Sequence, residues 1–236
     1  MKSLFYQIVS YVAVGSYFVP ILIVIGKKLW SQIAFRLFAL YWLISGLVNV
    51  VEFFTLSKRA TELFTVIYNI LDMPLVLGVF YFATCSASIK KFIRIAGPGF
   101  LAAEFTNCLI RGFNYDALKY LLGAGIIIVL SVIVWEIIFR LQKIKHTGQE
   151  KGLLLIYAAM LFEYGTYVVI YIFDYFLPDA SSTTDNFLVY YLSSLIALAV
   201  AVCGFLTRGI NAPAVKERFE TEAAYIPDFW LTEEFE

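Results

Sequence analysis

Long apolar runs alternate with short polar connections along this chain of 236 residues. A bilayer core about 30 Å thick requires roughly 20 apolar residues in helical form. Seven runs reach that length and predict seven membrane spans. They cover Leu4–Gly26, Ile33–Thr55, Thr61–Ala83, Ile89–Ile110, Ala117–Leu141, Gly152–Leu177 and Asn186–Arg208. Because the connections are short, consecutive spans must be antiparallel neighbours. We therefore expect an all-α, seven-helix transmembrane domain over residues 1–210.

The composition agrees with this pattern and removes two classes of protein. Hydrophobic residues make up 61% of the chain and charged residues only 15%, whereas a soluble domain has about 25% charged residues. A soluble enzyme is therefore excluded. The formal net charge is zero, which argues against a nucleic-acid partner because such proteins carry an excess of basic residues. The expected environment is the lipid bilayer.

The basic residues are distributed unevenly between alternate connections. Thirteen Lys and Arg lie after the first, third and fifth spans or beyond the seventh, and five lie on the opposite side. The positive-inside rule then places the N-terminus outside and the C-terminus in the cytoplasm. We interpret Leu4–Gly26 as a true span, because its apolar stretch is longer than a signal-peptide core and lacks a small-residue cleavage site. The predicted location is the cell (inner) membrane.

Polar and ionisable side chains recur on single faces of the predicted spans. Helical spacing gathers them in the middle or outer half of the bilayer, where they predict one acidic, tyrosine-rich pocket open to the outside. Ionisable groups inside membranes are costly and usually functional. The candidates for binding a ligand or proton are Asn49, Glu52, Asn69, Asp72, Glu104, Asn107, Glu163, Tyr167, Tyr171, Asp174 and Tyr190.

Two alternatives remain open for this polar set. Asn, Ser, Thr and Tyr often only hydrogen-bond across membrane helices, and acids near the headgroups cost little. Four acids, Glu52, Asp72, Glu104 and Glu163, are nevertheless many for a purely structural role, and no Lys or Arg is predicted to lie deep enough to pair with them. They are then either protonated or neutralised by a cationic ligand.

Helix breakers and a weak internal repeat suggest how the bundle could move. The sequence Gly97-Pro98-Gly99 predicts an interruption or hinge in the fourth span, and Pro20 and Pro74 are further kink candidates. At an offset of 122 residues, the acidic-aromatic sequence at 50–54 aligns with 172–176, and Tyr68 aligns with Tyr190. This pattern predicts two three-helix repeats joined by the fourth span, a 3+1+3 plan.

One further acid has a local interpretation. Glu136 precedes Arg140 by four residues near the inner end of the fifth span. This is the favourable order for an intrahelical ion pair. We expect the pair to lie on the protein surface.

Several chemistries of membrane proteins can be tested on the sequence. Residues 72–77 resemble part of the third helix of microbial rhodopsins, but a retinal Schiff base requires a lysine that the seventh span lacks, so no cofactor is expected. Zinc hydrolases need several histidines, and His146 lies in a connection, so no metal site is expected either. No motif indicates a catalytic residue. Paired carboxyls such as Asp72 with Glu163 are a weak enzymatic signal.

The chain ends in a polar segment, residues 211–236, which we predict to be a cytoplasmic tail. From Ala214 to Glu236 it contains seven acids, two basic residues and several aromatics. Such a segment could dock on the basic face of the bundle or on a cytoplasmic protein partner.

The predicted function is transport of a small solute, either a cation or a proton-coupled substrate. The hinge candidates, the repeat and the short tail favour this hypothesis. The first alternative is a seven-helix ligand sensor that signals through a partner, and the second is a structural or assembly subunit.

Overall fold

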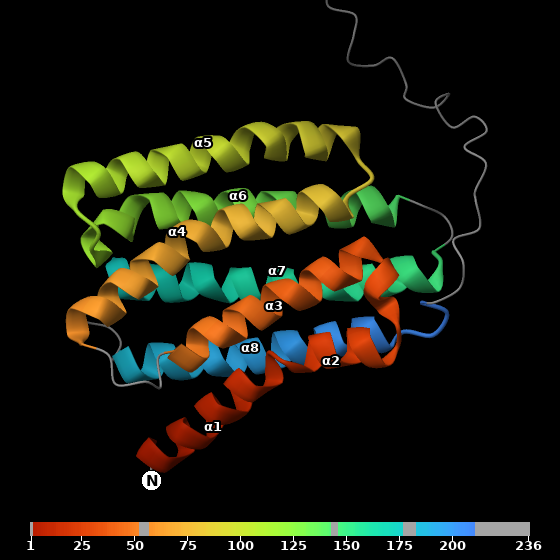
Figure 1. Ribbon diagram of the computed structural model, residues 1–236, viewed down its shortest axis with the longest axis horizontal. Coiled ribbons are helices and arrows are strands. Elements are labelled where there is room, and N and C mark those ends of the chain that lie inside the picture. The colour runs from red at the N-terminus through yellow and green to blue at the C-terminus, as the bar shows by residue number, and fades with distance from the viewer. Residues whose placement is uncertain (1, 52–56, 143–145, 177–182, 211–236) are drawn as a thin grey trace, which may run out of the picture.

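The computed structural model describes residues 2–51, 57–142, 146–176 and 183–210, which contain only helical secondary structure (Figure 1). The helices are α1 (Lys2–Ser16), α2 (Val19–Gly26), the short 3₁₀ helix η1 (Leu29–Ser31), α3 (Ile33–Val51), α4 (Lys58–Ala83), α5 (Ala87–Arg111), α6 (Tyr115–Leu141), α7 (Gly148–Tyr175) and α8 (Thr183–Leu206). Polar side chains cap several of their first turns. The Asn114 side chain accepts the Ala117 amide at 2.9 Å, and Thr147 forms a capping box with Glu150.

Six segments of the described chain are long and apolar enough to cross a membrane. They are Leu4–Gly26, which combines α1 and α2, and Ile33–Val51, Leu63–Ala83, Leu121–Leu141, Gly148–Tyr175 and Phe187–Leu206. The remaining predicted span, the fourth, is α5, which has 25 residues but carries Lys90, Lys91, Arg94 and Glu104, and it is not among the six. The helices are consistent with a polytopic integral membrane protein. The count of seven spans and their orientation stay predictions.

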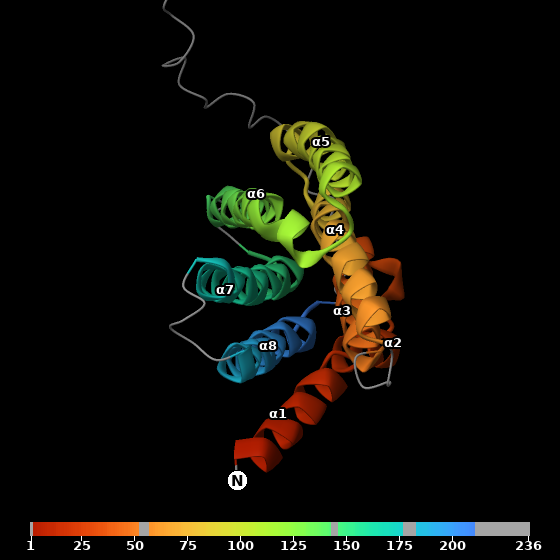
Figure 2. The same cartoon turned by 90° about the vertical axis from the view of Figure 1, so that its left-hand side faces the viewer.

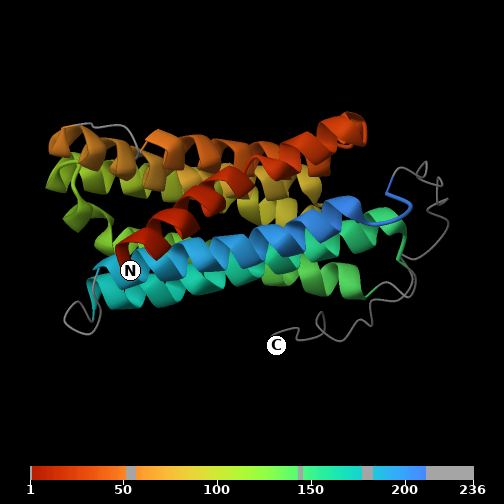
Figure 3. The same ribbon diagram turned by 90° about the horizontal axis from the view of Figure 1, so that it is seen from below.

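The helices follow one another around a closed bundle in chain order. Seen along the bundle in Figure 2, α3, α4 and α5 form one row, and α6, α7 and α8 form the other. Helices α5 and α6 join the rows at one edge. At the other edge α1 runs obliquely across the bundle and contacts both α3 and α8 (Figure 3). The 3+1+3 repeat stays a prediction.

The first predicted span is broken into two helices, whereas the fourth predicted span, α5, is one continuous helix. Helix α1 ends at Ser16 and α2 begins at Val19. Pro20 lies in the first turn of α2, where its missing N–H is not needed. Helix α5, by contrast, is helical from Ala87 to Arg111, so the chain is not interrupted at Gly97, Pro98 and Gly99. Their role as a hinge stays a prediction. No neighbouring atom comes closer than 4.0 Å to a Cβ built on either glycine. The helix therefore has room to accommodate Pro98 by bending rather than breaking.

Large aromatic side chains fill the half of the bundle that contains the α4–α5 and α6–α7 connections. The rings of Phe38, Phe80 and Tyr157, from α3, α4 and α7, lie 5.2–5.5 Å apart, and all three residues are fully buried. Trp42 and Phe205 continue this core toward α8, with ring centroids 6.1 Å apart. We call this region the closed half.

The Glu136–Arg140 pair forms as predicted, but its predicted surface position is wrong. Glu136 is fully buried and Arg140 nearly so. The Arg140 Nε donates to Glu136 at 2.8 Å, and its guanidinium also donates to the Ala83 carbonyl at 3.2 Å. Thr84 donates its hydroxyl to Glu136 at 2.5 Å. The pair is buried because it satisfies the carbonyl and hydroxyl groups left at the end of α4, which a surface pair could not reach.

Candidate functional site

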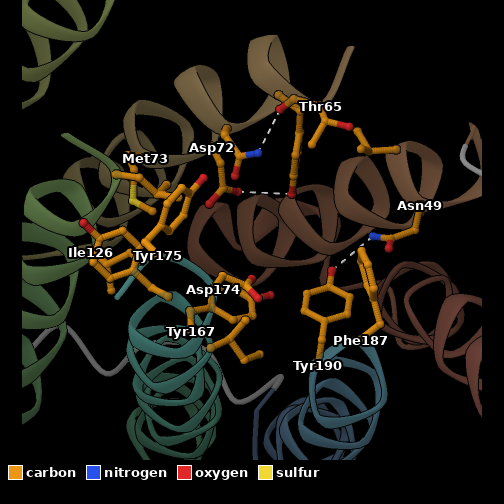
Figure 4. Close-up of a pocket in the computed structure, with 16 residues that line it drawn as sticks. Asn49, Thr65, Asp72, Met73, Ile126, Tyr167, Asp174, Tyr175, Phe187 and Tyr190 are labelled. Carbon is orange, nitrogen blue, oxygen red and sulfur yellow. Dashed lines mark hydrogen bonds between the residues drawn. The ribbon is translucent and has the colours of Figure 1, made fainter. Parts of the chain in front are cut away.

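A cavity of about 490 Å³ lies in the opposite half of the bundle, which we call the cavity half. Helices α3, α4, α6, α7 and α8 all contribute to its wall (Figure 4). Its lining residues are Val48, Asn49, Thr65, Tyr68, Asn69, Asp72, Met73, Leu122, Ile126, Tyr167, Ile170, Tyr171, Asp174, Tyr175, Phe187 and Tyr190. The volume is within the range of about 300–1,000 Å³ that is common for small-molecule sites.

Asp72 of α4 is the deepest acid of the cavity wall and is surrounded by tyrosine hydroxyls. Tyr41 and Tyr68 donate to its Oδ1 at 3.1 and 3.2 Å, and Tyr164 donates to its Oδ2 at 2.9 Å. The hydroxyls of Tyr41 and Tyr164 are also 2.9 Å apart. Asp72 therefore joins α3, α4 and α7 through donors that carry no formal charge.

Glu163 of α7 occupies a similar environment just outside the cavity. Tyr167 donates to its Oε1 at 3.0 Å and Tyr17 at 3.5 Å, while the Trp42 indole N–H donates to its Oε2 at 3.3 Å. Tyr17 is the residue at the break between α1 and α2, and its hydroxyl also lies within hydrogen-bond distance, 2.9 Å, of the Ser194 hydroxyl. The break thus brings a tyrosine from the first span to the carboxyl of α7.

Tyr190 of α8 links the cavity to this second carboxyl. Its hydroxyl accepts a hydrogen bond from the Asn49 amide at 3.3 Å, as Figure 4 shows, and lies 3.3 Å from the Tyr17 hydroxyl. Its ring stacks on Tyr167 at a centroid distance of 5.7 Å and an interplanar angle of 17°. A continuous set of hydrogen bonds therefore runs from the cavity wall through Tyr17 to Glu163.

The wall toward α6 is built on close backbone approach. Tyr171 donates its hydroxyl to the carbonyl of Lys119, and a Cβ placed on Gly123 would lie only 2.7 Å from the Tyr171 ring. Gly123 is therefore required for the contact between α6 and α7 at this level. One turn farther along α7, Asp174 lines the same cavity.

The structure divides the predicted site residues into three groups. Those that line the cavity are Asn49, Asn69, Asp72, Tyr167, Tyr171, Asp174 and Tyr190. Glu163 contacts the lining residue Tyr167 but lies deeper. Glu104 and Asn107 belong to α5 and do not line the cavity; Asn107 donates its amide to the Ala117 carbonyl instead. Glu52 lies outside the described residues, as does the predicted tail at 211–236. Ligand or proton binding by these residues stays a prediction.

The sequence argument missed five donors to the two carboxyls: Tyr17, Tyr41, Trp42, Tyr68 and Tyr164. A signal for two of them was present. Tyr41 precedes the polar residues Ser45 and Asn49 at spacings of four, and Tyr68 precedes Asp72 by four, so each shares their helix face. Tyr17 has no such signal, because its contact depends on the helix break.

The hydrogen bonds of Asp72 and Glu163 bear on whether these buried acids are protonated or neutralised by a bound cation. Asp72 and Glu163 each accept three hydrogen bonds from uncharged donors, so their oxygens are satisfied without a basic partner. The lining residues that the structure describes include two acids and no Lys, Arg or His. In the part of the chain described here, no group of three His, Cys, Asp or Glu side chains is placed to hold a metal ion. Binding of a polar or cationic ligand in this cavity stays a prediction.

Comparison with known proteins leaves the chain without an assigned family. No protein-family model matches the sequence, and no curated protein or solved structure matches it either. A fold alone does not specify a function. The function must therefore be argued from the geometry of the cavity and its carboxyls.

Proposed function

We propose that this protein binds a small organic cation in the cavity and transports it across the membrane. The observation that carries the proposal is that two acids and two stacked rings line one cavity: Asp72, Asp174, Tyr167 and Tyr190. The lining residues within the described ranges include no basic side chain. Aromatic faces attract ammonium groups, and carboxylates complement their charge. The preferred ligand is an amine or quaternary ammonium compound that carries an apolar or aromatic group.

The break in the first span supports transport. Discontinuous helices often form the solute site of transporters, because a break allows two half-helices to move separately. Here Tyr17 at the break contacts Tyr190, which lines the cavity. A change in the cavity wall can therefore reach the junction of α1 and α2 directly.

The closed half favours a second function, a sensor that binds the same cation without moving it. The rings of Phe38, Phe80 and Tyr157 fill the bundle beyond the cavity, and the Glu136–Arg140 pair joins the end of α4 to α6. A transporter must open this region in part of its cycle. A sensor can keep it closed and transmit small movements of the helices.

Two measurements on the full-length protein in proteoliposomes test these functions. The first is equilibrium binding of benzyltrimethylammonium, choline and tyramine, followed by tryptophan fluorescence because Trp42 lies beside Glu163. The neutral isostere of choline, in which carbon replaces nitrogen, is the control for charge. We expect at least one cation to bind and the neutral isostere not to. Failure of all three cations to bind would overturn the proposed ligand class.

The second measurement is uptake of the bound cation with and without a pH gradient. Accumulation above that in protein-free liposomes supports a transporter. Binding without uptake overturns the transport proposal and supports the sensor.

A further inference from the structure

Glu104 differs from the other buried acids because no described group satisfies it. Its side chain is fully buried in the second half of α5. Neither carboxyl oxygen has a hydrogen-bond partner among the described residues. An ionised carboxylate in this position would lose its hydration without receiving donors in return. The same carboxyl is far easier to accommodate when it carries a proton.

Glu104 lies one helical turn from an apolar cluster to which three helices contribute. Phe100, Glu104 and Cys108 are spaced by four residues, so they share one buried face of α5. Cys108 packs with Val66 of α4 and Ala117 of α6. The Cys108 thiol lies one turn from Glu104 on the same face of α5. Among the described residues, no basic side chain forms an ion pair with Glu104.

Glu136 provides a matched comparison within the same chain. Both glutamates are fully buried. Glu136 receives hydrogen bonds from Arg140 at 2.8 Å and from Thr84 at 2.5 Å. Glu104 receives none. Because both side chains are equally buried, burial does not distinguish them. The lack of hydrogen-bond donors to Glu104 is the difference that favours a protonated carboxyl at this position.

We infer that Glu104 is a proton-binding site, separate from the solute cavity, whose proton is exchanged during transport. The exchange part rests on the proposed transport function, whereas proton binding does not. The two sites share a wall: Leu122 lines the cavity and also packs on the cluster that contains Cys108. Met73 lines the cavity as well, and a Cβ on Gly125 would touch both Met73 and Phe100. A shift of α4 or α6 on solute binding would therefore change the surroundings of Glu104.

Infrared spectroscopy of the full-length protein in proteoliposomes tests the proton site without any solute. A protonated carboxyl has a carbonyl band that a carboxylate lacks. We expect Glu104→Gln to lose one such band at neutral pH, and Glu136→Gln, the matched control, to lose none. Glu104→Asp keeps an acid at this position and should retain a band. Size-exclusion elution and helical circular dichroism confirm that each variant folds.

Two outcomes would overturn the proton site. In the first, the acid bands of the wild type and Glu104→Gln are identical at every pH examined. In the second, sodium or potassium chloride removes the Glu104 band at constant pH, which would identify a metal-cation site instead. The same spectra therefore distinguish the two possible occupants.

A transport measurement tests the exchange of this proton. Glu104→Gln should abolish the effect of a pH gradient on uptake of the cation identified above. Equilibrium binding of that cation should change by less than about twofold, because Glu104 does not line the cavity. Loss of binding in Glu104→Gln would place the residue in the solute site and overturn the separation. Absence of binding in the wild type would instead overturn the proposed function and leave the infrared result intact.

Discussion

The two halves of the bundle satisfy their buried carboxyls in different ways. In the cavity half, Asp72 and Glu163 accept hydrogen bonds from tyrosine hydroxyls and one indole, none of which carries a formal charge. In the closed half, Glu136 is held by the guanidinium of Arg140. Uncharged donors leave the negative charge of a carboxylate available to a ligand, whereas an arginine neutralises it. The cavity half is therefore suited to binding and the closed half to stability.

The two arrangements also differ in how strongly they resist change. Removing one partner of a buried ion pair leaves an uncompensated charge and typically costs about 3–5 kcal/mol. Removing one hydroxyl from a membrane network costs about 0.6 kcal/mol on average. If this comparison is correct, variants in the closed half will affect folding more than variants of single donors in the cavity half.

The largest expected effect is that of Arg140→Met in the closed half. This change leaves Glu136 buried without its charged partner and removes the donor to the Ala83 carbonyl. We expect the free energy of unfolding to fall by about 3–5 kcal/mol. The measurement is denaturant unfolding in detergent micelles, followed by tryptophan fluorescence.

The double variant Glu136→Gln with Arg140→Met is the control for this prediction. It removes both charges, so it should recover a large part of the stability that Arg140→Met loses. Equal stability of the single and double variants would show that the charge of Glu136 is not the source of the effect. The closed half would then depend on packing rather than on its ion pair.

A smaller effect, on binding rather than stability, is expected for Asp72→Asn in the cavity half. Asparagine retains the size of the side chain and still accepts hydrogen bonds, but it lacks the negative charge. A hydrogen bond to a charged group is worth about 1.5–3 kcal/mol, so cation affinity should fall by roughly ten- to a hundredfold. Equilibrium binding of the cation identified above measures this. Unchanged affinity would remove Asp72 from the binding site.

The tight contact near the helix break gives the third prediction, Gly46→Ala. A Cβ on Gly46 would lie 2.7 Å from the Cβ of Tyr17, too close for the helices to remain in place. We expect a loss of about 1–3 kcal/mol in unfolding free energy. Gly165→Ala is the matched control, because nothing lies within 4 Å of a Cβ there. If both variants are equally stable, the contact between α3 and the break does not constrain the bundle.

Much of the helical architecture could be predicted from the sequence, because the length of each apolar run and the charged residues in each connection are local properties of the chain. Helix α5 shows the limit of that argument: Lys90, Lys91 and Arg94 reduce its apolar character, yet it packs against α4 and α6 as part of the bundle. Packing partners depend on tertiary contacts that composition does not specify.

The candidate site was predictable where polar residues share one helix face. Asn49, Asn69 and Asp72 were found in this way, and all three line the cavity. Glu104 has the same residue type as Glu163, but it belongs to α5, which contributes no described residue to the cavity wall. Its separation from the cavity depends on the place of α5 in the bundle, which residue spacing alone does not reveal. The predicted surface position of Glu136 is wrong because the spacing of four residues predicts the ion pair with Arg140 but not the packing of this pair against the end of α4.

The smallest expected effect, that of Tyr17→Phe, tests the comparison between the halves most directly. The variant keeps the aromatic ring and removes the hydroxyl that contacts Glu163, Tyr190 and Ser194. We expect the free energy of unfolding to fall by about 0.6–1 kcal/mol, because the hydrogen-bond network loses one hydroxyl group. Tyr157→Phe is the matched control in the closed half, because this tyrosine is also fully buried but its hydroxyl has no hydrogen-bond partner among the described residues. Its removal should leave stability unchanged or slightly increased. A greater loss for Tyr157→Phe than for Tyr17→Phe would contradict the comparison, because the hydroxyl of the closed half would then contribute more to stability than the hydroxyl network of the cavity half.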